Sequence, residues 1–181
     1  SYYNFKGKSP GTLLSSITPD YGVAFSGDTG RYSADNLSKW ITQTSKATSV
    51  NHAIAINVGA IANYRVTVYL AVTALAEFNF KTTAYNIWNN YIDINVGTSS
   101  TIKNIYPGSP VGGTTLVTTS RITYPQSNAF LWEFEVIGDI VKIYFEGTYL
   151  TQYTHSNAGT YFSMILGDIG DVLQSIKIEQ I

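Results

Sequence analysis

The sequence contains no cysteine, and only 13% of its 181 residues are charged. The lack of thiols excludes a disulfide framework and a thiolate metal site, so the fold must rest on its core alone. The net charge of −1 provides no basic surface for nucleic acid or for an anionic membrane. No apolar run reaches membrane-spanning length, and residues 1–8 lack a signal-peptide pattern, so we expect a soluble chain without membrane insertion.

Catalytic and cofactor motifs are also scarce. The two histidines, His52 and His155, are far apart and have no carboxylates at ligand spacing, which argues against metal or triad chemistry. The glycine-rich pieces at 27–30 and 108–113 lack the lysine and the strand-to-helix context of a phosphate-binding loop. These absences predict a protein that is not an enzyme.

Aromatic and β-branched residues are abundant, with 14 Tyr, 8 Phe and 3 Trp. Such residues favour strands, and Tyr64 to Val72 alternates apolar and polar positions with a period of two. Short strands separated by turn signals are typical of a sandwich or a jelly roll. No linker or repeat divides the chain, so we predict a single all-β domain, an antiparallel β-sandwich over residues 1–181.

The clearest local element is a hairpin over Ala129 to Gly147. Gly138-Asp139 is a two-residue turn signal that pairs Ile137 with Ile140. Counting outward places six apolar side chains on one face, from the pairs Val136–Val141, Phe134–Ile143 and Trp132–Phe145. The opposite face receives Glu135 across from Lys142 and Glu133 across from Tyr144.

Two further segments give weaker predictions. Alternation in Val172 to Ile181 predicts a final strand with Val172, Ile176 and Ile178 directed inward. Residues 99–128, rich in Pro and Gly, read as a long connection around a short strand at 114–124.

Two parts of the sequence resemble one group of proteins. Phe5-Lys6-Gly7 followed by Gly11 to Gly22, which includes Thr18-Pro19-Asp20, resembles the opening of concanavalin A-like lectin/glucanase (laminin G-like) jelly-roll modules. The closing hairpin, Gly167 and the Asp171-Val172 strand also resemble the ends of such modules, whereas the middle of the chain does not match.

The resemblance implies a jelly roll of the concanavalin A-like type, found in phage and virion surface proteins and in secreted bacterial proteins. It therefore implies glycan binding or adhesion to a host-surface polysaccharide, at an extracellular location or on a virion surface. Some members hold a structural calcium ion, and the resemblance implies that Asp171 and backbone oxygens near Asn4 would be its ligands here. Calcium takes six to eight oxygen ligands, and the sequence clearly offers only one carboxylate.

Sugar rings stack on aromatic side chains while their hydroxyls bond small polar groups, so a lectin-like site needs both kinds of residue together. Two stretches have that mixture. In Tyr85 to Asp93 the residues that share one strand face are Tyr85, Asn89, Tyr91 and Asp93. In Tyr149 to Asn157, which reads as an exposed loop, the candidates are Tyr149, Tyr153 and His155.

Two alternatives stay open at this point. A structural virion or filament protein would use the same aromatic, weakly charged surface for self-association or for packing against other virion proteins. A glycoside hydrolase would need paired carboxylates, for which Glu133 and Glu135 are the candidates, but the third acid of the related glucanases is missing. The sequence does not determine which glycan is bound.

Overall fold

The computed structural model describes residues 1–5, 7–34, 41–43, 52–84, 90–97, 99–122, 129–167 and 170–181. Within these ranges the regular elements are strands and two short 3-10 turns, η1 (Leu14–Ser16) and η2 (Thr29–Arg31). No helix in this part of the chain is long and apolar enough to cross a membrane.

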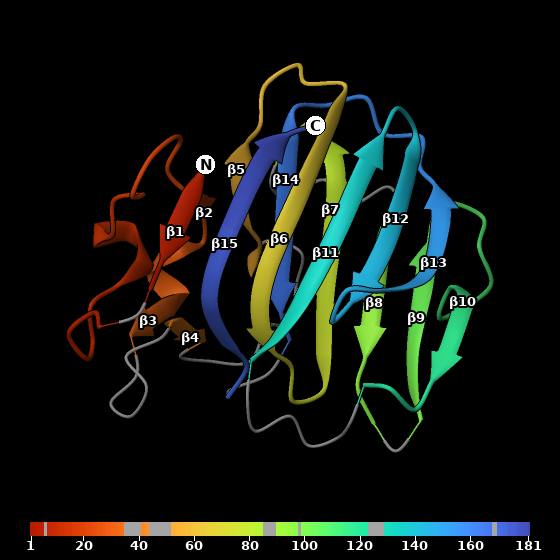
Figure 1. The fold of residues 1–181 in the computed structure, drawn as a ribbon, viewed down its shortest axis with the longest axis horizontal. Coiled ribbons are helices and arrows are strands. Elements are labelled where there is room, and N and C mark those ends of the chain that lie inside the picture. Colours follow the sequence, from red (N-terminus) through yellow and green to blue (C-terminus); the bar gives the residue numbers. More distant parts are fainter. Residues whose placement is uncertain are drawn as a thin grey trace.

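The predicted antiparallel β-sandwich is confirmed, because the strands form two sheets in which every pairing is antiparallel. The eight-stranded sheet faces the viewer in Figure 1, and the seven-stranded sheet lies behind it. In spatial order, the eight-stranded sheet consists of β13 (Thr148–Thr154), β12 (Ile140–Phe145), β11 (Phe130–Ile137), β6 (Asn63–Ala71), β15 (Val172–Gln180), β4 (Ile41–Gln43) and β3 (Tyr32–Ala34), with β1 (Tyr2–Asn4) on β15. The seven-stranded sheet consists of β10 (Thr114–Thr119), β9 (Ser100–Ile105), β8 (Tyr91–Asn95), β7 (Leu75–Thr82), β14 (Tyr161–Leu166), β5 (Ile54–Asn57) and β2 (Ser26–Gly27).

The hairpin of β11 and β12 has the predicted register. Ile137 pairs with Ile140 across the Gly138-Asp139 turn, and Trp132 pairs with Phe145 at the far end. Gly138 has a φ of 58°, a left-handed conformation that suits glycine and a tight hairpin turn. The six predicted inward side chains of this hairpin are all buried.

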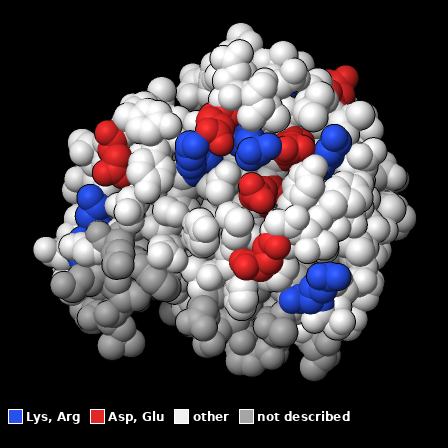
Figure 2. Space-filling model, viewed as in Figure 1, with Lys and Arg blue, Asp and Glu red and all other residues white. Residues whose placement is uncertain are grey.

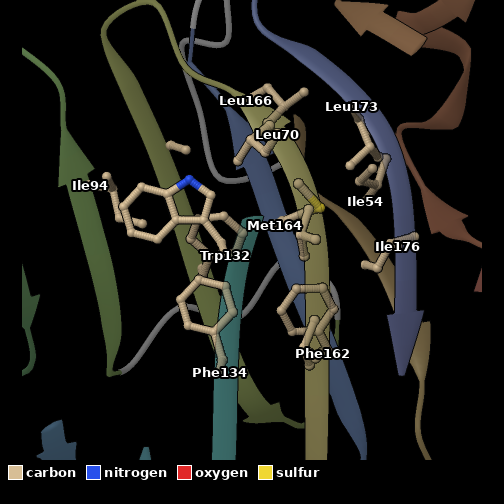
Figure 3. Close-up of a cluster of buried hydrophobic side chains, with 14 of the residues drawn as sticks. Ile54, Leu70, Ile94, Trp132, Phe134, Phe162, Met164, Leu166, Leu173 and Ile176 are labelled. Atoms are coloured by element: carbon tan, nitrogen blue, oxygen red, sulfur yellow. The ribbon is translucent and has the colours of Figure 1, made fainter. Parts of the chain in front are cut away.

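The core between the sheets is built around aromatic rings. The Phe134 ring on β11 lies 4.8 Å from that of Phe78 and 5.3 Å from that of Phe80, both on β7 of the other sheet. Trp132 stacks beside Phe134, and Met164 and Phe162 of β14 complete the cluster (Figure 3). Burial of one such side chain contributes about 1.5–3 kcal/mol, so this cluster holds the two sheets together.

The prediction for the last strand was right in type and wrong at one position. Leu173 is fully buried, whereas Val172 is half-buried, although Ile176 and Ile178 point inward as predicted. A register shift between Leu173 and Ser175 explains this, because a bulge inserts one extra residue and reverses the side-chain alternation beyond it.

The prediction of a long connection over residues 99–128 was wrong in its first part. Residues 100–105 form strand β9, which pairs with both β8 and β10. Its composition of Ser, Thr, Lys and Asn concealed the alternation, since Ile102 is the one large apolar residue that it directs into the core.

Candidate functional site

The outer face of the seven-stranded sheet carries two of the predicted site residues. Tyr91 and Asp93 alternate along β8 with Ile92 and Ile94, which are fully buried in the core. Because successive strand residues point to opposite faces, Tyr91 and Asp93 lie half-buried on the face directed away from the core.

Glu77 of β7 stands directly across from Asp93, and we call these two residues the carboxyl pair. The Val96 N–H donates to the Ala74 carbonyl at 2.7 Å, so by alternation Glu77 and Asp93 form a non-hydrogen-bonded pair. In such pairs the Cα atoms are only about 4.5 Å apart, which brings the side chains as close as antiparallel strands allow. Two like charges in this position repel each other.

The electrostatics of the carboxyl pair follow from this arrangement. Burial raises the pKa of Glu77 to about 7, and the neighbouring Asp93 carboxylate adds to the rise. Burial also raises the pKa of Asp93 to about 6, against the opposing effect of the Lys103 ammonium. Burial and both carboxylates raise the pKa of Tyr91 to about 12, so its phenol stays neutral.

Two oxygens on this face have no hydrogen-bond donor or acceptor among the described residues. One is the buried Oδ1 of Asp93, and the other is the Oγ of the fully buried Ser163 on β14. Ser163 pairs with Asn79, and its neighbour two residues on, Ile165, pairs with Glu77, so the hydroxyl belongs to the same face. Buried polar atoms normally have partners, so these two unsatisfied oxygens set this face apart.

A network of asparagines holds this end of the sheet in place. Asn104 Nδ2 donates to Asn90 Oδ1 at 2.7 Å and to the Tyr91 carbonyl at 3.0 Å. Asn157 Nδ2 donates to the Asn90 carbonyl and to Asn79 Oδ1. These bonds tie β7, β8, β9 and the segment before β14 together, which fixes the start of β8 and therefore Tyr91.

Tyr91 and Asp93 share one strand face, as the sequence predicted, and their role in binding stays a prediction. Tyr85 and Asn89, predicted beside Tyr91 and Asp93, lie outside the described residues. Glu77 and Lys103 were missed, although each occupies an outward position of an alternating strand in a sequence with few charges. Isolated charged residues at outward strand positions were the feature of the sequence that could have identified them.

The second predicted stretch, Tyr149 to Asn157, is not the exposed loop that its composition suggested. Most of it is edge strand β13, and the three candidates do not share one surface. Tyr149 is 50% exposed, whereas Tyr153 and His155 are buried. Burial and the Lys81 ammonium lower the pKa of His155, so its imidazole is neutral inside the protein.

Asp171, the predicted calcium ligand, is fully buried. Its Oδ1 accepts hydrogen bonds from the backbone N–H and from the hydroxyl of Thr73, both at 2.6 Å. Among the described residues no group of three His, Cys, Asp or Glu side chains could hold a metal ion. Asp171 thus fixes the turn at Thr73, and its role as a calcium ligand stays a prediction.

Glu133 and Glu135 lie on the outer face of the eight-stranded sheet, where acids and bases alternate across the strands (Figure 2). One row, which we call the charge ladder, crosses β15, β6, β11 and β12 as Glu179, Arg65, Glu135 and Lys142. Arg65 Nη2 donates to Glu135 Oε1 at 2.6 Å, and the Tyr144 hydroxyl donates to Glu135 Oε2 at 3.0 Å.

These two donors, the guanidinium first, lower the pKa of Glu135. A general acid for glycoside hydrolysis needs a raised pKa, so Glu135 is poorly suited to that role. Beside the charge ladder, the ring of Tyr149 makes an edge contact with the ring of Tyr144. The two ring centroids are 5.7 Å apart.

No protein-family model and no curated protein sequence matches this chain. Solved structures match it in three dimensions. The carbohydrate recognition domain of Emp47p gives a TM-score of 0.59 at 8% identity, covering 98% of this chain and 97% of that one. The carbohydrate-binding module CBM66 from Bacillus subtilis gives 0.58 at 12% identity, covering 86% and 95%.

A structure from work on endo-acting O-glycanases of the human gut microbiota also matches, with a TM-score of 0.59 at 11% identity over 98% and 97% of the two chains. At such low identities the likeness concerns the fold alone. The fold is the two-sheet antiparallel β-sandwich that these structures share, which agrees with the jelly roll that the resemblance in the sequence implied.

Proposed function

We propose that this protein binds carbohydrate on the outer face of the seven-stranded sheet, through Tyr91, Asp93 and Glu77. The observation that carries the proposal is the buried Asp93 Oδ1, which has no donor among the described residues and lies beside a half-buried tyrosine. The names of two matching structures, a carbohydrate recognition domain and a carbohydrate-binding module, support the same class of ligand.

The chemistry suits a sugar. A sugar hydroxyl donates to a carboxylate oxygen, and hydrogen bonds to charged groups contribute about 1.5–3 kcal/mol when the acceptor is otherwise unsatisfied. The apolar face of a sugar ring packs on an aromatic side chain, which Tyr91 provides two residues from Asp93. The charge ladder is a weaker candidate, because both carboxylate oxygens of Glu135 already accept hydrogen bonds.

A glycan array followed by isothermal titration calorimetry tests the proposal. We expect Asp93→Asn to weaken binding at least tenfold, because the amide presents a neutral and partly donating group to the sugar hydroxyl. The control is Glu135→Gln, which removes the same charge from the opposite face and should leave the Kd unchanged. Equal losses in both variants, or no binding to any glycan, would contradict the proposal.

Glycoside hydrolysis is a second candidate, favoured by one observation. Glu77 has a raised pKa and stands across from a second carboxyl group, which is the arrangement of an acid beside a nucleophile. Incubation with β-glucans and mucin-type O-glycans tests this activity. If the protein releases products and both Glu77→Gln and Asp93→Asn abolish this release, then the protein is a hydrolase and not a binding module.

The location belongs to the proposal as well. A place on a virion surface or in a secreted assembly stays a prediction, as does self-association through exposed tyrosines such as Tyr21, Tyr69 and Tyr149. A large assembly in light scattering, without glycan binding, would favour the structural alternative.

A further inference from the structure

The carboxyl pair has no close ion-pair partner among the described residues. The nearest base across the sheet is Lys103, which pairs with Asp93 in the β8–β9 register. The Lys103 ammonium lies beside Gly112 instead. If that glycine carried a Cβ atom, the Lys103 Nζ would be 4.0 Å from it. Within the described part of the chain, neither Glu77 nor Asp93 forms an ion pair within 4.0 Å.

The hydrogen-bonding inventory of the face is equally one-sided. Asp93 Oδ1 on β8 is a buried acceptor without a donor in the described residues, and Glu77 opposite it is a second carboxyl group. The buried Ser163 hydroxyl on β14, two strands from Asp93, can both donate and accept. A group that fits here must therefore supply donors and positive charge. An ammonium has three donors and no acceptor, and it also interacts favourably with an aromatic face such as that of Tyr91.

We infer that the ligand is a cationic sugar, an oligosaccharide of amino sugars with free amines, whose ammonium group lies between Glu77 and Asp93. This inference rests on the proposed function and adds the chemical class of the glycan. A neutral sugar satisfies Asp93 Oδ1 but leaves two close carboxyl groups that must retain a proton. An ammonium replaces that proton and lets both groups ionise.

The replacement of a proton by the ligand's ammonium group makes the affinity depend on pH. The groups that face the pair are Lys103 on β9, Tyr91 on β8, Asn79 on β7, and Ser163 and Ile165 on β14. Of these, Lys103 and Tyr91 are the titratable ones, and Tyr91 stays neutral. An amino sugar should bind roughly tenfold more tightly at pH 6.5 than at pH 5, since binding releases a proton. A neutral sugar gains only a stronger hydrogen-bond acceptor as the carboxyl groups ionise, so its affinity should rise less than that of the amino sugar over the same pH range.

The experiment compares chitosan oligosaccharides, which carry free amines, with chitin oligosaccharides of equal length, which are N-acetylated. Calorimetry at pH 6 should give a Kd at least tenfold lower for the free-amine form. Glu77→Gln and Asp93→Asn should each remove most of this preference. Glu135→Gln changes the net charge equally on the other face and should keep the preference, which separates a local site from general attraction between charges.

The outcomes separate the two proposals. Equal or tighter binding of the acetylated oligosaccharide overturns the cationic ligand and leaves carbohydrate binding in place. A free-amine preference that survives in both carboxyl variants also overturns it, provided that their thermal unfolding shows intact folds. Failure of every glycan to bind overturns both proposals.

Discussion

The two outer faces of the sandwich carry carboxylates in opposite electrostatic states. On the eight-stranded sheet Glu135 lies between Arg65 and Lys142, and its pKa is lowered by the guanidinium. On the seven-stranded sheet Glu77 faces Asp93 without a paired base, and its pKa is raised to about 7 by burial. The chain therefore satisfies one acid fully and leaves the other in need of a proton or a ligand.

This difference is the reason for proposing the binding site on the seven-stranded sheet. Charges that are paired across strands stabilise a solvated face modestly, and they present nothing for a ligand to complete. An unpaired, half-buried acid costs stability, and a protein retains such a cost where binding or chemistry uses it.

The largest expected effect comes from removing the unpaired acid. The folded-state pKa of Glu77 lies above its ordinary value. The stabilisation that comes from keeping this carboxyl group protonated is therefore fully present below about pH 4.5, and it is lost as the pH rises through about 7. Glu77→Gln should therefore raise the free energy of unfolding by roughly 2–3 kcal/mol at pH 8 and leave it nearly unchanged at pH 4.5. Urea unfolding at the two pH values measures this, and an equal difference at both would contradict it.

Tyrosine substitutions compare the two faces as ligand surfaces. Tyr91→Ala should weaken glycan binding at least tenfold, about 1.4 kcal/mol or more, because a stacking surface is lost. Tyr149→Ala removes a more exposed ring from the other face and should leave the Kd unchanged in the same calorimetric titration. The reverse result would move the site to the eight-stranded sheet.

A smaller effect is expected from the satisfied acid. The pKa of Glu135 is lowered in the folded state, so its contribution is present above about pH 4.5 and is lost as the pH falls through the folded-state value. Glu135→Gln should cost about 0.5–1 kcal/mol at pH 7, since Arg65 is partly exposed to solvent, and less at pH 3.5. Urea unfolding that shows a larger cost in acid would contradict this account.

The smallest expected effect concerns Lys103, whose ammonium lowers the pKa of Asp93 from a distance. Lys103→Met should move the titration midpoint of the Asp93 carboxyl carbon, followed by NMR, to higher pH. The midpoint of Glu135 serves as the internal control and should not move.

Much of the fold could be predicted because its information is local. The Gly138-Asp139 turn and the alternation on both sides of it sufficed to give the register of β11 and β12. Strand β9 escaped prediction because two of its three inward residues, Ser100 and Asn104, are polar, so that apolar and polar positions do not alternate. The bulge in β15 reversed an alternation that the sequence shows as regular.

The candidate site divides in the same way. The sequence by itself determined that Tyr91 and Asp93 share one face of a strand, because side chains alternate with a period of two. Only the tertiary structure decided that Glu77 stands opposite Asp93, that neither forms an ion pair within 4.0 Å among the described residues, and that Arg65 pairs with Glu135. Those neighbours come from other strands, and the register between strands depends on how the whole core packs.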